Sequence, residues 1–95
     1  MGKRVTKKAD DPQTAQAIVD LYQQMADAWG SPIVPRSKIE EFTGGLISGK
    51  YLANLDSAGQ GIPGAIRCGN KVAYPTKSLV MWLTARSNSI SHQEE

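Results

Sequence analysis

The chain has 95 residues and a formal net charge of +2, from 11 lysines and arginines against nine aspartates and glutamates. A chain of this length forms one domain with a single small core. Its one histidine, His92, and one cysteine, Cys68, exclude an intramolecular disulfide and a multi-cysteine zinc site. This inventory argues against an enzyme, and we expect no cofactor and no metal.

The sequence predicts a cytoplasmic protein without a membrane segment. No run approaches the roughly 18 apolar residues that a spanning helix needs. The basic start is not followed by an apolar stretch, which argues against a signal peptide. We expect residues 1–10 to form a basic flexible tail and residues 88–95 a polar flexible one.

Charge is unevenly distributed along the chain. Residues 1–8 carry four basic side chains and no acid, and residues 33–87 carry seven basic side chains against three acids. This asymmetry is typical of a surface that binds a polyanion, although a basic tail by itself more often only aids solubility.

The first predicted element is an amphipathic helix within residues 11–30. Asp11 can cap it and Pro12 suits its first position, while Gly30 and Pro32 end it. Apolar residues recur at helical spacing along one face, namely Ala15, Ile18, Tyr22, Met25 and Trp29. This face either packs on the rest of the domain or forms a contact with another chain, such as a homodimer through Ile18, Tyr22, Met25 and Trp29.

Two short helices are expected next. Ile39 and Phe42 are three residues apart and Gly44 ends their pattern, which predicts a helix of about two turns. After the turn "GGLIS", Ser48 offers an N-cap hydroxyl to a helix that runs to Gly59. Two short helices joined by a glycine-containing turn are typical of a helix-turn-helix.

A hairpin and a last helix complete the predicted order. Residues 65–68 and 71–74 are β-prone, and the intervening Gly69 and Asn70 are expected to supply the positive φ angles of a tight turn. "PTKSLVMWLTARS" then predicts a helix to about Arg86, capped by Thr76 or its neighbour. The predicted fold class is therefore mainly α with a small β-hairpin, in the order of a winged helix-turn-helix over residues 33–87.

The second helix of the pair, within residues 48–58, is the candidate for reading DNA, because the major groove admits one helix. Helical projection turns Leu52 and Leu55 to the core and leaves a polar face outside. We expect Asp56 to make a structural hydrogen bond or to be solvated, because phosphate repels it, and Trp82 to be core. The candidate DNA contacts are Ser48, Lys50, Tyr51, Asn54 and Ser57 in the major groove, Arg67, Asn70 and Lys71 in the wing (65–74), and Arg36 and Lys38 on phosphate.

Residues 34–86 resemble the MerR-like winged-helix family of small regulators that contains phage excisionases and AlpA-type transcriptional activators. The matching features are the helix with Ile39 and Phe42 that ends at Gly44, the start at Ser48 and Leu52, "GQGIP", "IRCGNKVAYP" and "SLVMWL". The resemblance implies binding of double-stranded DNA without catalysis, either beside an integrase in DNA excision or at promoters with RNA polymerase. It also implies a bacterial or prophage setting.

A protein-interaction module is the rival interpretation. In it, the same fold recruits a recombinase or polymerase through the helix face at residues 15–29. The long helix that precedes the family-like region is the element that would serve this purpose.

Overall fold

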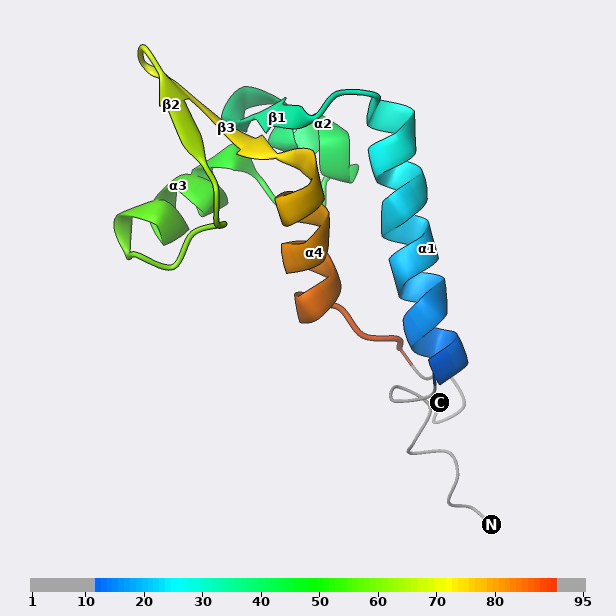
Figure 1. Ribbon diagram of the computed structural model, residues 1–95. Coiled ribbons are helices and arrows are strands. Elements are labelled where there is room, and N and C mark those ends of the chain that lie inside the picture. Colours follow the sequence, from blue (N-terminus) through cyan, green and yellow to red (C-terminus); the bar gives the residue numbers. More distant parts are fainter. Residues whose placement is uncertain (1–11, 91–95) are drawn as a thin grey trace.

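The computed structural model describes residues 12–90, which form four α-helices, one 3₁₀ helix and three short strands. In chain order they are α1 (Pro12–Trp29), β1 (Ile33–Pro35), the 3₁₀ helix η2 (Arg36–Lys38), α2 (Ile39–Thr43), α3 (Gly49–Ser57), β2 (Ile66–Cys68), β3 (Lys71–Pro75) and α4 (Thr76–Arg86). α1 and α4 lie side by side, whereas α3 and the β2–β3 hairpin lie on the other side of the molecule (Figure 1).

Some expectations fall on the ends of the chain. The basic tail over residues 1–10, the Asp11 cap and the polar segment 91–95 with His92 lie outside the described residues. None of the helices within residues 12–90 combines the length and the hydropathy that crossing a bilayer requires.

α1 spans the predicted range, and its apolar stripe packs inward. The indole Nε1 of Trp29 donates a hydrogen bond to the Ile33 carbonyl at 2.9 Å, and its ring meets Phe42 edge-on, with centroids 5.4 Å apart. Tyr22 and Met25 also pack against the buried core. Of the two alternatives for this stripe, packing on the rest of the domain is therefore observed for Tyr22, Met25 and Trp29, which are half-buried. The homodimer contact through the same face stays a prediction.

The sheet has one strand more than the sequence predicts. β3 is central in an antiparallel order β1-β3-β2, with Val34 opposite Tyr74 and Arg67 opposite Val72. β1 has only three residues, which is too short to show the alternation that marks a strand. The two hairpin strands themselves form as predicted.

The hairpin turn depends on one left-handed residue rather than two. Gly69 has a φ of 63°, a conformation that costs glycine little and other residues more. Every other residue with positive φ in the described part of the chain is also a glycine. Asn70 therefore does not adopt the positive φ expected of it, and the turn follows the pattern with glycine at its first central position.

The two short helices are confirmed with their predicted ends. α2 stops at Gly44, which is left-handed. Ser48 caps α3, since its Oγ accepts a hydrogen bond from the Tyr51 backbone N–H at 3.1 Å. Such a cap satisfies one of the free N–H groups at a helix start.

α4 starts where expected, with its N-cap at the neighbour of Thr76, but no side chain caps it. Thr76 is the first helical residue and Pro75 occupies the N-cap without a side-chain cap. The Thr76 hydroxyl instead donates to the Ser31 carbonyl at 2.7 Å, and its backbone N–H donates to the Pro32 carbonyl at 2.8 Å. These bonds tie α4 to the connection between α1 and β1.

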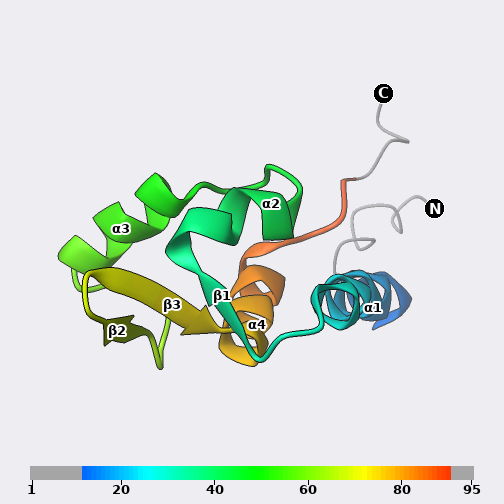
Figure 2. The ribbon, with the colours of Figure 1, turned by 90° about the horizontal axis from the view of Figure 1, so that it is seen from above.

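One core joins most of these elements. Its buried apolar residues come from β1, α2, α3, the loop after α3, β3 and α4, and they are Val34, Ile39, Phe42, Leu52, Ile62, Tyr74, Leu79 and Leu83. The view from above shows α2 and α3 on one side of the sheet and α1 at the far end from the hairpin (Figure 2). The described chain is mostly helical with a three-stranded antiparallel sheet. This agrees with the prediction of a mainly α chain with a β-hairpin, apart from the added strand.

Candidate nucleic-acid interface

α3 presents one polar face to solvent. Lys50, Asn54 and Ser57 are all exposed, while Leu52 on the opposite face is completely buried. Leu55 is half-buried against the core. The predicted orientation of this helix is therefore confirmed. A cation, a carboxamide and a hydroxyl stand together on it, and these groups can donate to the acceptors of base edges and phosphates.

Tyr51 lies at the border of this face. It is 42% exposed, and its ring centroid is 6.5 Å from that of Trp82. Trp82 packs against the core on one side, and the Arg86 guanidinium carbon lies 4.1 Å from the centre of its ring. Trp82 is thus only partly the core residue that the helical spacing predicts, because it also carries a cation on its ring.

The hairpin brings three predicted contacts together. Arg67, Asn70 and Lys71 are all exposed, and together with Ser37 they line a hollow of about 310 Å³ between the hairpin and η2. Two cations and an amide around one concave surface provide donors for an oxyanion. Cys68, in β2, is an exposed free thiol.

Arg36 also lines this hollow, but its guanidinium belongs to an internal cluster. Its Nη2 donates to Asp56 Oδ2 at 2.5 Å, and its Nε donates to the Tyr74 hydroxyl at 3.0 Å. The same hydroxyl donates to Asp56 Oδ2 at 2.8 Å. The structural hydrogen bond expected of Asp56 is confirmed. Arg36 holds η2, α3 and β3 together, which differs from the phosphate contact expected of it.

The cluster is closely enclosed. A Cβ at Gly61 would overlap the carboxylate of Asp56, so the loop after α3 can approach only because this residue is glycine. Burial raises the pKa of the Tyr74 phenol, with Asp56 adding to the rise and Arg36 opposing it. For Arg36, burial disfavours the charged form, but the hydrogen bonds to Tyr74 and Asp56 outweigh it and raise the pKa of the guanidinium. The negative charge of Asp56 on α3 is therefore paired with the positive charge of Arg36.

Lys38 is held less firmly. Its Nζ lies 3.5 Å from a carboxylate oxygen of Glu41, and both side chains are more than half exposed. An exposed pair of this kind contributes about 0–1 kcal/mol, so the lysine can exchange its partner for a phosphate. Glu40 lines a second hollow together with Ser48 and Tyr51, which places an acid beside the start of α3.

Sequence reasoning missed the tie between Arg36, Asp56 and Tyr74. These residues are 18 to 38 positions apart along the chain, so no local spacing relates them. One feature of the sequence could have indicated this tie. Asp56 is the single acid between residues 42 and 90, and an isolated acid in a basic region favours an internal cation as its partner.

Comparison of the chain with protein-family models, with curated proteins and with solved structures found no match.

Proposed function

We propose that this chain is a sequence-specific double-stranded DNA-binding protein, an excisionase-like or AlpA-like regulator with a winged helix-turn-helix. The observation that carries the proposal is the pairing of two exposed polar surfaces. α3 turns Lys50, Asn54 and Ser57 outward, and the β2–β3 hairpin with Arg67, Asn70 and Lys71 projects on the same side of the molecule (Figure 1).

In the proposed complex α3 enters the major groove. Asn54 lies midway along its polar face and reads a base edge, most naturally an adenine, whose N6 and N7 match a carboxamide. Lys50 and Ser57 flank it at spacings of about one helical turn. Ser48 and Tyr51 lie at the start of the helix, where the groove edge and backbone pass.

The hairpin supplies the sequence-independent contacts. Arg67, Asn70 and Lys71 meet phosphates beside the groove, which fixes the register of α3 without reading sequence. Lys38 joins them by exchanging Glu41 for phosphate. Arg36 contributes through Asp56 and Tyr74, by holding α3 at a fixed angle to the hairpin.

The rival function is recruitment of a recombinase or polymerase through the 15–29 face. Three of the large residues on that face, Tyr22, Met25 and Trp29, are partly buried against this chain's own core, which favours the DNA-binding proposal. A variant that lacks residues 1–30 would also lose the contact between Trp29 and Phe42, and we expect it to unfold rather than to lose only partner binding.

The test compares Asn54→Ala with Lys71→Ala on two short duplexes, one selected from a random pool by the unmodified chain and one of unrelated sequence. Binding is followed by fluorescence anisotropy over a series of salt concentrations. Asn54→Ala should cost about 1–3 kcal/mol on the selected duplex and little on the other. Lys71→Ala should weaken both duplexes alike and lower the salt slope by about one unit.

Matched controls come from the chain itself. Asn88→Ala removes an exposed carboxamide outside the helices, and Lys77→Ala removes a lysine from α4. Neither variant should change the preference for the selected duplex, provided that the duplex is short enough to bind only one chain. Equal losses on the two duplexes for Asn54→Ala, or losses in the controls as large as those of Asn54→Ala and Lys71→Ala, would contradict the proposal.

A further inference from the structure

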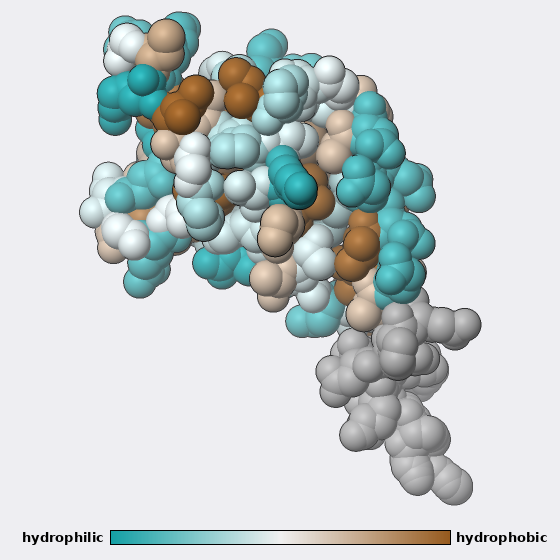
Figure 3. Space-filling view, in the orientation of Figure 1, coloured by the Kyte–Doolittle hydropathy of each residue, from teal (hydrophilic) through white to brown (hydrophobic). Residues whose placement is uncertain are grey.

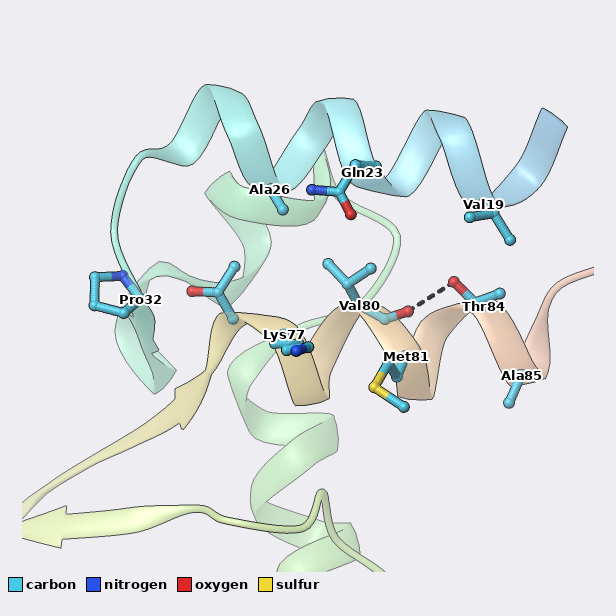
Figure 4. Close-up of a pocket in the computed structure, with 10 residues that line it drawn as sticks. Val19, Gln23, Ala26, Pro32, Lys77, Val80, Met81, Thr84 and Ala85 are labelled. Carbon is cyan, nitrogen blue, oxygen red and sulfur yellow. Dashed lines mark hydrogen bonds between the residues drawn. The ribbon is translucent and has the colours of Figure 1, made fainter. Parts of the chain in front are cut away.

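An apolar groove runs between α1 and α4. Its cavity has a volume of about 650 Å³. Figure 4 shows Val19, Gln23 and Ala26 of α1 facing Val80 and Thr84 of α4 across it, whereas Met81, which also lines the cavity, points away from α1. The space-filling view shows hydrophobic surface between these two helices (Figure 3).

The polar groups of the groove are largely used within the chain. Thr84 donates its hydroxyl to the Val80 carbonyl at 2.8 Å, and the Gln23 amide donates to Asp27 at 3.0 Å. By contrast, Val19 is 40% exposed and Met81 is 63% exposed. A groove with exposed apolar side chains and few free donors favours an apolar occupant.

The two helices that form the groove carry opposite charges. α1 contains Asp20 and Asp27 and no basic residue, and α4 contains Lys77 and Arg86 and no acid. Within residues 12–90 the ion pairs are Arg36–Asp56 and Lys38–Glu41. Neither joins α1 to α4, so within residues 12–90 the complementary charges of these helices are not paired with one another.

We propose that a second copy of this chain occupies the groove and forms a two-fold symmetric dimer. An isologous contact offers the same patch on both copies. A two-fold axis parallel to the helices lays α1 of one copy over α4 of the other, which sets acid against base twice. An axis across the helices would lay α1 on α1 and oppose aspartates to aspartates.

The same geometry selects the charge pair. Ala26 and Lys77 line the same end of the groove (Figure 4), and Asp27 adjoins Ala26. A two-fold axis parallel to the helices does not change the height of a residue along the helix axis, so residues at the same height in the two copies face each other. Asp27 of each chain therefore faces Lys77 of the other, and the exposed Met81 is covered.

This contact uses a face of α1 other than its inward stripe. It also lies away from α3 and the hairpin (Figure 1), so the dimer is inferred independently of the DNA-binding proposal. Ten residues line the groove, compared with roughly 20–30 residues per partner in a standard stable interface. We therefore expect a dimer that dissociates on dilution.

The experiment is sedimentation velocity of the full chain over a concentration series, with Asp27→Lys and Lys77→Glu as variants. Each single variant opposes like charges twice and should weaken dimerisation at least about tenfold. Mixing the two variants should restore association, because in the mixed dimer the two introduced charges are opposite and face each other, while the unchanged Asp27 and Lys77 pair at the second contact. The chain that carries both changes should dimerise by itself.

A second pair of variants tests the apolar part. Met81→Glu puts a charge in the groove and should abolish dimerisation. Leu21→Glu is the control, because Leu21 lies on α1, is 64% exposed and does not line the groove. This variant should leave dimerisation unchanged. Circular dichroism checks that each variant is folded. A chain that stays monomeric at every concentration, or variants that fail to restore association on mixing, would overturn the proposal.

Discussion

α1 and α3 are attached to the core in different ways. α1 is held mainly by aromatic and apolar contacts, of which the edge-on packing of Trp29 against Phe42 is the clearest. α3 has one buried leucine, Leu52, and at its other end an ionic cluster through Asp56. Apolar contacts are non-directional, whereas hydrogen bonds to charged groups fix an orientation. The helix proposed to read DNA is thus the one whose angle is fixed by directional bonds.

The largest expected effect concerns the attachment of α1. Phe42 is 5% exposed, and Phe42→Ala should lower the free energy of unfolding by about 4 kcal/mol, since it removes core volume and leaves a cavity under Trp29. Urea unfolding followed by circular dichroism measures this. Leu46→Ala, at a residue 63% exposed, is the control and should change stability by less than about 0.5 kcal/mol. Similar losses for both would mean that α1 does not depend on this contact.

A smaller loss is expected at α3. Asp56→Ala leaves the Arg36 guanidinium and the Tyr74 hydroxyl without their acceptor, and we expect a loss of about 2 kcal/mol, because these groups are largely withdrawn from solvent. Asp20→Ala is the matched control, an exposed acid that accepts a hydrogen bond from Gln16. It should cost less than about 0.5 kcal/mol. Equal losses of stability for Asp56→Ala and Asp20→Ala in urea unfolding would contradict the view that the ionic cluster attaches α3 to the core.

The smallest effect is a dependence on alkaline pH. The pKa of Tyr74 is raised in the folded chain, so the unfolded chain loses this proton first as pH rises. The contribution of the Tyr74 proton to the free energy of unfolding is complete below the ordinary tyrosine pKa of about 10. It declines as the pH rises from there through the raised pKa of the folded chain. Tyr74→Phe should be less stable at neutral pH but should lack this part of the alkaline decline. Parallel stability curves for the two chains above about pH 10 would contradict the assignment.

Local pattern was enough to predict most elements. The stripe from Ile18 to Trp29 predicted α1, Ser48 predicted the cap of α3, and the turn at Gly69 predicted the hairpin, since each depends on residues a few positions apart. The exposed face with Lys50 and Asn54 followed from helical geometry in the same way. The N-cap of α4 lies next to Thr76, as predicted. The hydrogen bond from the Thr76 hydroxyl to Ser31 was missed, because Ser31 is distant in sequence.

What the sequence by itself determined is therefore which stretches are helix or hairpin and which side of each is polar, because propensity, capping and periodicity act over one or two turns. Only the tertiary structure decided the pairing of β1 with β3, the use of Arg36 as an internal tie rather than a free cation, and the inward turn of the α1 stripe. It also decided that α1 and α4, which carry charges of opposite sign, border an apolar groove. These features depend on contacts between residues far apart in the chain, and a charged or apolar side chain carries no local mark of the partner that folding brings to it.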